Sequence, residues 1–187
     1  YFTARAWWQD LGNALRFLTR LPVPPTRDPA RPDFLDDALD EAQDAPAPRP
    51  FGRAVRVFPL VGALLGIAAG FAFAIATGLG LPVLVAGVIA VAVLALMTGA
   101  LHEDGLADMA DGFGGGHNAE RKLAIMRDSR IGTYGVIAVA FSLTARVAAL
   151  ATIAEPALVF AALVVTAAAS RAAMPLIMVL LPMARSD

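Results

Sequence analysis

The chain has 187 residues, 58% of them hydrophobic, and a formal net charge of −1. Its mean hydropathy of +0.65 is far above that of a soluble domain, so we predict a membrane protein in contact with a lipid bilayer. No basic patch is interleaved with aromatic residues, so nucleic-acid binding is set aside. The absence of cysteine excludes disulfides, thiolate metal sites and a cysteine nucleophile.

Residues 1–21 are predicted to form an amphipathic helix in the membrane interface. Apolar residues recur there at roughly helical spacing, with arginines between them: Phe2, Trp7, Trp8, Leu11, Leu15 and Leu18, with Arg5, Arg16 and Arg20. Prolines end this helix, and residues 22–56 are predicted to be a Pro- and Asp-rich cytoplasmic loop. The alternative is a metal or partner site in its acidic run, residues 36–44.

Residues 57–187 are predicted to form the catalytic domain, an all-α polytopic helix bundle of about four to five spans. The run 57–101 contains no charged residue and is long enough for two spans of a hydrocarbon core about 30 Å thick. Because glycines and Pro82 interrupt it, we expect helices over 59–77 and 82–100.

The segment 101–135 carries ten of the fifteen charged residues beyond residue 56. On a helix, Asp104, Asp108 and Asp111 would share one face. Like charges at this spacing destabilise an isolated helix by about 0.2–0.5 kcal/mol per pair. We therefore expect a cation among them, and hard oxygen ligands favour Mg²⁺ or Mn²⁺ over zinc. The alternative is a solvated acidic loop beside the membrane.

A glycine cluster follows the aspartates: Gly112, Gly114, Gly115 and Gly116. These residues are predicted to end the helix and to let backbone N–H groups, in particular those of Gly114 and Gly115, approach a phosphate, with a flexible turn as the alternative. Asn118 is the expected N-cap of a short helix over 119–127. That helix would bring Lys122 and Arg127 towards Asp128 and Arg130, which indicates an anionic substrate beside a metal; ordinary juxtamembrane charge is the alternative.

Two further apolar stretches complete the bundle. One covers 133–154, and the other begins at Pro156 and reaches residue 181, either as one helix or as two pieces bent near Pro175. An arginine inside such a span costs about 2.5–3.5 kcal/mol unless it is paired or hydrated, so Arg146 and Arg171 are expected to face the polar site of the segment 101–135. Snorkelling to the interface is the alternative, chiefly for Arg171.

Charge asymmetry predicts the orientation. Arginines are frequent before residue 57, whereas the turns at 78–82 and 154–156 carry no Lys or Arg, so these turns are expected to face outward. The acidic segment and the N-terminus would then face the cytoplasm from the inner cell membrane. A divalent cation, an anionic substrate and a glycine-rich segment together favour phosphoryl transfer.

Three segments, residues 99–108, 111–116 and 126–135, closely resemble the cobalamin synthase (adenosylcobinamide-GDP ribazoletransferase) family, and residues 17–24 and 58–62 look like its opening segments. The resemblance implies Mg²⁺-dependent transfer of the adenosylcobinamide-phosphate group from adenosylcobinamide-GDP to α-ribazole or its 5′-phosphate, with release of GMP, in cobalamin biosynthesis. Two features depart from the family: a longer acidic insertion before residue 51, and an end at Asp187 where more membrane helices are expected.

The resemblance also implies residue roles. The metal ligands would be Glu103, Asp104, Asp108 and Asp111; Asp111 and Asp128 would be catalytic, Asp128 as a further ligand or as the base; and Lys122, Arg130 and Arg171 would hold phosphates. The competing predictions are a transporter or ion channel and a CDP-alcohol phosphotransferase of lipid synthesis. The oligomeric state, including a homo-oligomer, is left open.

Overall fold

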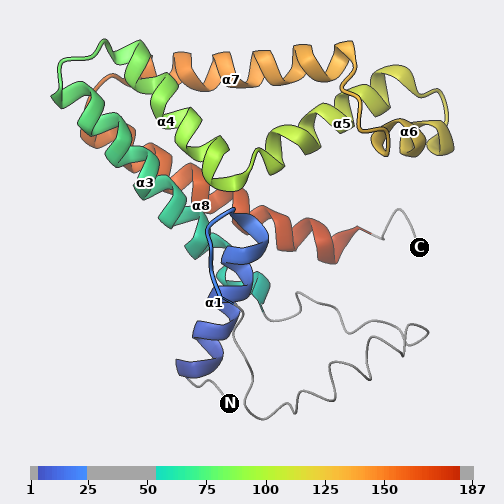
Figure 1. The fold of residues 1–187 in the computed structure, drawn as a ribbon, viewed down its shortest axis with the longest axis horizontal. Helices are drawn as coiled ribbons and strands as arrows, with labels where there is room; N and C mark the ends of the chain where they lie inside the picture. The colour runs from blue at the N-terminus through green and yellow to red at the C-terminus, as the bar shows by residue number, and fades with distance from the viewer. Residues whose placement is uncertain (1–3, 25–53, 182–187) are drawn as a thin grey trace.

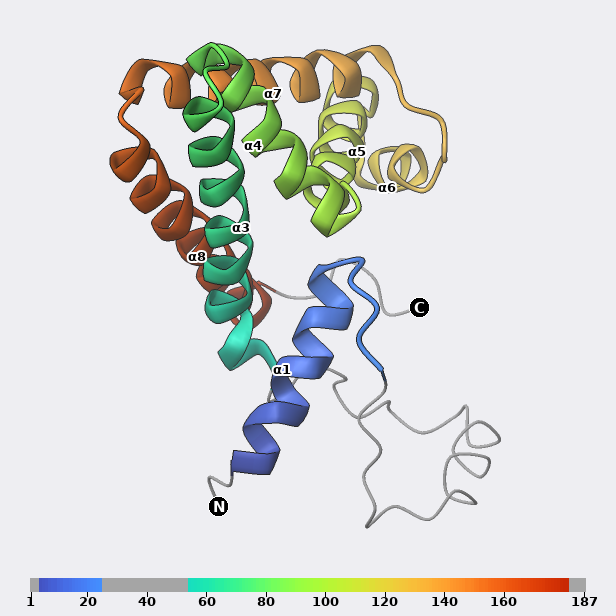
Figure 2. The same cartoon turned by 60° about the vertical axis from the view of Figure 1, so that its left-hand side comes forward.

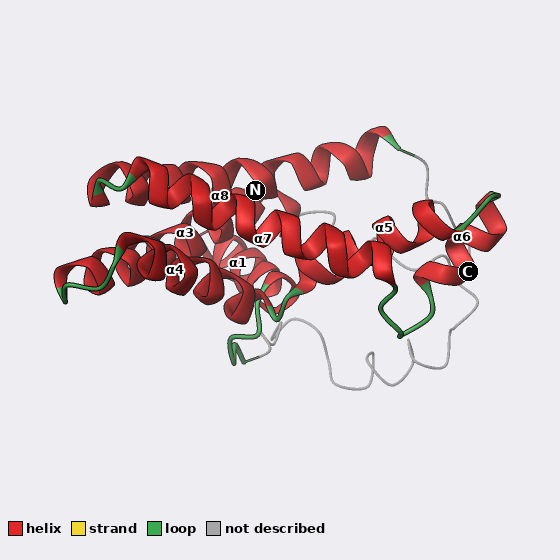
Figure 3. Ribbon diagram, turned by 90° about the horizontal axis from the view of Figure 1, so that it is seen from above, coloured by secondary structure: helices red, strands yellow, loops and turns green. Residues whose placement is uncertain are grey.

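The computed structural model describes residues 4–24 and 54–181, which contain helices and turns and no β-strand (Figure 3). The elements in chain order are α1 (Ala4–Leu18), the 3₁₀ helix η1 (Ala54–Val57), α3 (Phe58–Gly78), α4 (Val83–Thr98), α5 (Leu101–Gly115), α6 (Ala119–Met126), α7 (Thr133–Ile153) and α8 (Pro156–Leu180). The predicted all-α class is confirmed.

Three helical segments are long and apolar enough to cross a membrane: Ala54–Gly78, Thr133–Ile153 and Pro156–Met178. The pair α4 and α5 passes the same test when taken together, but it is bent by 88°. The prediction of a membrane protein is confirmed. The helix expected over 82–100 is found as α4, and it is long enough to span only when it is taken together with α5, so the described residues contain three spans or up to four.

The helices α3 and α8 pack side by side in opposite directions (Figures 1 and 2). On α3, Gly62, Gly66 and Gly70 face α8, and a Cβ atom on Gly66 would lie 2.5 Å from the backbone oxygen of Leu163. Glycines at every fourth position let two helix backbones approach closely, which strengthens van der Waals packing where no hydrophobic effect operates between helices in lipid. The α8 helix is continuous and contains Pro175 in its interior. Of the two predicted forms, the single long helix is therefore the one found.

The sharp bend between α4 and α5 comes from two consecutive left-handed residues, Gly99 with φ 63° and Ala100 with φ 58°. In Figure 1, α4 and α5 form a V that opens upward, and α7 lies across its open side and contacts both arms. The bend therefore places α5 beside α7 instead of letting it continue the path of α4.

The α1 helix packs against η1 and the start of α3, at the end of the molecule far from α7 (Figure 2). Ala14 and Leu18 are fully buried there, and Arg56 donates a hydrogen bond of 2.5 Å to the carboxylate of Asp10. Trp8 remains 70% exposed, and the placement of residues 1–21 in the membrane interface stays a prediction. The predictions for the acidic run 36–44 fall outside the described residues, and the domain boundaries stay predictions.

Candidate functional site

The α5 helix carries polar side chains on two opposite faces, and each face lines a separate cavity. His102, Glu103 and Leu106 line one cavity, whereas Asp104 and Asp108 line the other. With 3.6 residues per turn, these two sets point in opposite directions from the helix axis. Glu103 is therefore not on the face of the aspartates, although it is next to Asp104 in the chain.

We call the cavity beside the aspartates the acidic pocket. It has a volume of about 260 Å³ and lies between α5 and the segment from the end of α6 to the start of α7. Its lining residues are Asp104, Ala107, Asp108, Met126, Arg127, Asp128, Ser129, Arg130 and Ile131. Neither Asp104 nor Asp108 forms an ion pair with any residue in the described ranges. These two carboxylates are thus uncompensated negative charges, one helical turn apart.

Asp128, on the opposite wall, is already paired. Its Oδ2 accepts a hydrogen bond of 2.7 Å from Nη2 of Arg130, and its Oδ1 accepts from the backbone N–H of Arg130 at 3.1 Å. The bonds from the Arg130 side chain and backbone lower the pKa of Asp128 to about 2. Asp128 is therefore ionised at neutral pH and holds the Arg130 guanidinium in place.

Asp111 has a different partner from the one predicted. Its Oδ2 accepts a hydrogen bond of 2.6 Å from the backbone N–H of Gly132, and its Oδ1 accepts one of 2.9 Å from that of Gly135. These N–H groups belong to the first turn of α7, which has no intrahelical partner for them and is the positive end of the helix. A Cβ atom on either glycine would collide with the carboxylate. Asp111 thus fastens α7 to α5; its predicted metal and catalytic roles stay predictions.

The predicted four-carboxylate metal set is not assembled in the structure. Glu103 lies on the other face of α5, and its Oε1 accepts a hydrogen bond of 2.8 Å from Nη2 of Arg146. Within residues 4–24 and 54–181, no group of three or more His, Asp or Glu side chains is arranged to hold a metal ion. Of the four predicted ligands, the structure brings only Asp104 and Asp108 together in one cavity.

The predicted phosphate-binding cations lie in three different places. Lys122 places its Nζ 4.3 Å from the ring centroid of Phe113, Arg130 binds Asp128, and Arg171 lies on the far side of α5. Arg127 was predicted to lie near Asp128, and both residues line the acidic pocket.

The glycine cluster ends the helix as predicted, since α5 stops at Gly115 and Gly116 is its C-cap, and Gly114 and Gly115 belong to its last turn. Their predicted approach to a phosphate stays a prediction. A Cβ atom on Gly114 would lie 2.5 Å from the ring of Tyr134, and one on Gly115 would lie 3.3 Å from Ile125. These glycines are small so that α6 and α7 can approach α5. The following helix is as expected: the side chain of Asn118 accepts a hydrogen bond of 2.8 Å from the backbone of Arg121.

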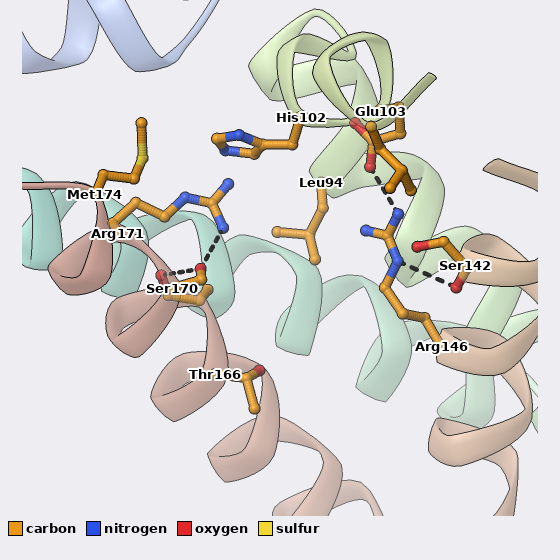
Figure 4. Close-up of a pocket in the computed structure, with 11 residues that line it drawn as sticks. Leu94, His102, Glu103, Ser142, Arg146, Thr166, Ser170, Arg171 and Met174 are labelled. Atoms are coloured by element: carbon orange, nitrogen blue, oxygen red, sulfur yellow. Dashed lines mark hydrogen bonds and ion pairs between the residues drawn. The ribbon is translucent and has the colours of Figure 1, made fainter. Parts of the chain in front are cut away.

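We call the other cavity the arginine pocket, and Figure 4 shows it. It has a volume of about 390 Å³ and is lined by Leu94 of α4; His102, Glu103 and Leu106 of α5; Ser142 and Arg146 of α7; and Thr166, Ala167, Ser170, Arg171 and Met174 of α8. Arg146 and Arg171 both reach this cavity and not the acidic pocket, so they face a polar site other than the one that contains the aspartates. Arg171 is only 8% exposed, so it is buried and does not snorkel.

The family model described as cobalamin-5-phosphate synthase matches residues 10–187. This chain belongs to the cobalamin-5-phosphate synthase family. The adenosylcobinamide-GDP ribazoletransferase of Azorhizobium caulinodans is 47% identical to it over 180 residues, which cover 95% of this chain and 63% of the relative. The protein of the same name from Bradyrhizobium diazoefficiens is 47% identical over 178 residues, 95% of this chain and 62% of the relative.

A third relative named adenosylcobinamide-GDP ribazoletransferase, from Sinorhizobium medicae, is 42% identical over 186 residues, which cover 98% of this chain and 65% of the relative. The chain therefore spans just under two thirds of the length of these cobalamin-5-phosphate synthase family members. No solved structure matches it. The family resemblance predicted from the segments around residues 99–135 is confirmed.

Several residues of the arginine pocket were not predicted from the sequence of this cobalamin-5-phosphate synthase family member: His102, Ser142 and Ser170. The pairing of Glu103 with Arg146 was not predicted either. A helical projection of residues 101–115 contains a usable signal, since His102 and Glu103 fall opposite the aspartates. The partners on α7 and α8 have no comparable signal in the local sequence.

Proposed function

We propose that the protein to which this chain belongs is an adenosylcobinamide-GDP ribazoletransferase. It would transfer the adenosylcobinamide-phosphate group to a hydroxyl of α-ribazole or its 5′-phosphate and release GMP. The names of the relatives at 42–47% identity support this reaction. The observation that carries the proposal is the acidic pocket, in which Asp104 and Asp108 face Asp128 and Arg130 with no cation paired to them.

The donor set of this pocket fits Mg²⁺. Two carboxylates one helical turn apart, without a cationic partner, are hard oxygen ligands. Mg²⁺ is commonly held by one or two carboxylates, with substrate phosphates and water completing the octahedron. A pair of aspartates is therefore sufficient when the substrate is a pyrophosphate. When bound, the ion would neutralise negative charge on the pyrophosphate.

The remaining residues of the pocket would position the substrate. Arg130, held by Asp128, presents its guanidinium at the rim and is suited to a phosphate oxygen. A carboxylate with a pKa of about 2 is a poor base at neutral pH, because the best general bases titrate near the working pH. Asp128 would therefore orient Arg130, in preference to the role of base that the family resemblance implied for it.

The acceptor hydroxyl would attack the phosphorus that carries the cobinamide, and the bond from that phosphorus to the bridging oxygen would break. The bridging oxygen leaves with GMP, and the hydroxyl proton passes to solvent or to a base outside the groups assigned above. In such phosphoryl transfers the protein acts mainly by positioning and by stabilising charge, so no covalent nucleophile is needed. This suits a pocket that contains no cysteine and is lined by three aspartates.

The nucleotide product tests the reaction. The full-length protein in nanodiscs is given adenosylcobinamide-GDP and α-ribazole, and the released nucleotide is identified. We expect GMP, and we expect a chelator of divalent ions to stop its release and added Mg²⁺ to restore it. Release of CMP from a CDP-alcohol would support the lipid-synthesis alternative, and no nucleotide release together with solute flux would support a transporter.

The orientation of the chain in the membrane is part of the proposal. The arginine-rich start and the uncharged turns favour an acidic pocket on the cytoplasmic side. In this cysteine-free chain, Leu79→Cys lies in the turn before α4 and His117→Cys in the turn before α6. An impermeant thiol reagent applied from outside should label the first variant only, and the opposite pattern would overturn the orientation.

A further inference from the structure

The arginine pocket is a second polar cavity that the proposed reaction does not use. It opens on the face of α5 opposite the acidic pocket and is closed by α4, α7 and α8. Figure 4 shows the side chains of Arg171 and His102 close together at one side and those of Arg146 and Glu103 at the other, with Leu94 between them.

Hydrogen-bonding groups in this pocket lack partners. Arg171 is 8% exposed, and its Nη1 donates a hydrogen bond of 3.0 Å to Ser170, but its Nε has no partner. The Nε2 atom of His102 and the Oε2 atom of Glu103 are also buried without a partner. Buried polar groups are nearly always hydrogen-bonded, so three such atoms around one cavity indicate a missing ligand.

The charge of the pocket selects an anion. Glu103 and Arg146 form an ion pair of 2.8 Å and compensate each other. Arg171 forms no ion pair with any described residue, which leaves one buried positive charge. A guanidinium offers several N–H donors in a planar fork, which matches the oxygens of a phosphate group.

The walls of the pocket select an amphiphilic ligand. Leu94, Leu106 and Met174 line it beside the charged groups, and the volume of about 390 Å³ leaves room for more than a phosphate group. Two of its walls, α7 and α8, are helices long and apolar enough to cross a membrane, and they make few contacts with each other. An apolar tail attached to the phosphate could therefore leave the pocket between them.

We propose that the arginine pocket binds the phosphate group of an amphiphilic molecule, with Arg171 as its main ligand and His102 as a second hydrogen-bond donor. Glu103 holds Arg146 at the far wall and offers its Oε2 to a hydroxyl of the same ligand. A membrane phospholipid and a water-soluble phosphate ester share this chemistry. The family resemblance implied a metal-binding role for Glu103 and a phosphate-binding role for Arg171, and in this proposal both residues act in the arginine pocket, on the face of α5 opposite the acidic pocket.

The test measures binding to the full-length protein in nanodiscs of phosphatidylcholine. In one arm, phosphatidylcholine is replaced stepwise by phosphatidic acid; in the other, glycerol 3-phosphate is titrated at constant ionic strength. Thermal unfolding gives the apparent dissociation constant in each arm, because a ligand that binds only the folded state raises the midpoint with concentration. We expect saturable stabilisation in at least one arm, and the responding arm identifies the source.

Substitutions locate the effect. Arg171→Ala should weaken binding at least about tenfold, and Arg171→Lys should recover it only partly, because a lysine keeps the charge but not the fork. Arg121→Ala removes an exposed arginine of α6 and serves as the matched control that keeps full binding. His102→Ala and Ser170→Ala provide a second measurement if Arg171→Ala does not fold, and each should weaken binding. Equal binding by all pocket variants and the control, or no saturable stabilisation in either arm, would overturn the proposal.

Discussion

The two faces of α5 present opposite electrostatic problems within a helix of 15 residues. The face that carries Asp104 and Asp108 has negative charge with no cation paired to it, whereas the face of His102 and Glu103 meets two arginines, of which Arg171 has no carboxylate partner among the described residues. Charges beside apolar helices are costly unless they are compensated. The two proposals above would complete each face with a ligand of opposite sign, and the adjacent residues Glu103 and Asp104 line different pockets.

The largest expected effect separates the two faces by activity. Asp104→Asn and Asp108→Asn each keep side-chain shape but remove a charge, and each should lower GMP release by about 10²–10³-fold, comparable to the loss of a preorganised charge-stabilising group. The double variant should be scarcely worse than the poorer single one, because residues that act as a unit are non-additive. GMP release over a Mg²⁺ series measures this. Near-normal turnover in both single variants would remove the metal role from this face.

Stability without metal is the control for those variants. Two carboxylates one turn apart repel each other by about 0.2–0.5 kcal/mol, so Asp104→Asn and Asp108→Asn should unfold at the same temperature as the parent or slightly higher when Mg²⁺ is absent. A large loss of stability would mean that the aspartates are structural, and the activity loss would then have another cause.

On the face of His102 and Glu103, substitutions should change the stability of the fold. Glu103→Gln leaves Arg146 without its partner in a part-buried position, since the Glu103 side chain is 11% exposed and that of Arg146 39%. Loss of one partner of a fully buried pair costs about 3–5 kcal/mol, and partial exposure of Arg146 reduces our expectation to about 1–3 kcal/mol. A double-mutant cycle with Arg146→Gln, measured by unfolding in denaturant, should show that the double variant is less destabilised than the sum. Strict additivity would contradict the pairing.

Asp111 should behave as a structural residue on the acidic face. Asp111→Ala removes two acceptors from the first turn of α7 and should destabilise the protein by about 1–2 kcal/mol. Hydrogen exchange should accelerate at the amides of Gly132 and Gly135 before it does so elsewhere in α7. A variant with normal exchange at these amides but no activity would instead support the predicted metal or catalytic role of Asp111.

A substitution at the bend between α4 and α5 should have a smaller effect, and it should stabilise the protein. Ala100 has φ 58°, a left-handed conformation that costs an L-residue about 1–2 kcal/mol. Ala100→Gly relieves this strain at the expense of a more flexible unfolded chain, so a net stabilisation of about 0.5–1 kcal/mol is expected in thermal unfolding. A destabilised variant would mean that the methyl group of Ala100 packs usefully at the bend.

The smallest effect concerns pH. The folded-state pKa of Asp128, about 2, lies below its ordinary value of 3.8. A lowered pKa stabilises the fold above the ordinary value, and this contribution is lost as the pH falls through the folded value. Thermal unfolding of the parent relative to Asp128→Asn should therefore be independent of pH from about 5 to 8, and the difference should shrink between about 4 and 2. The pair is exposed, so high salt should reduce the difference further.

Local sequence patterns were sufficient to predict where most helices begin and end. The apolar runs predicted α3, α7 and α8 to within a few residues, and Pro82 and Pro156 marked the starts of α4 and α8. Asn118 predicted the start of α6. These features depend on hydrophobicity, on missing N–H groups or on capping within one turn, all of which are properties of neighbouring residues.

The tertiary structure alone decided how the charges are shared. Glu103 and Arg146 are 43 residues apart in the chain, and Asp111 is 21 residues from Gly132. The spacing of the three aspartates predicted one acidic cluster, to which the family resemblance added Glu103. The bend at Gly99 and Ala100 places α5 against α7, where Glu103 and Asp111 have other partners. An alanine in a left-handed conformation has no signature in the sequence. Contacts between distant helices depend on how the helices pack, so the sequence determined which residues are charged and helical, and only packing determined which of them meet.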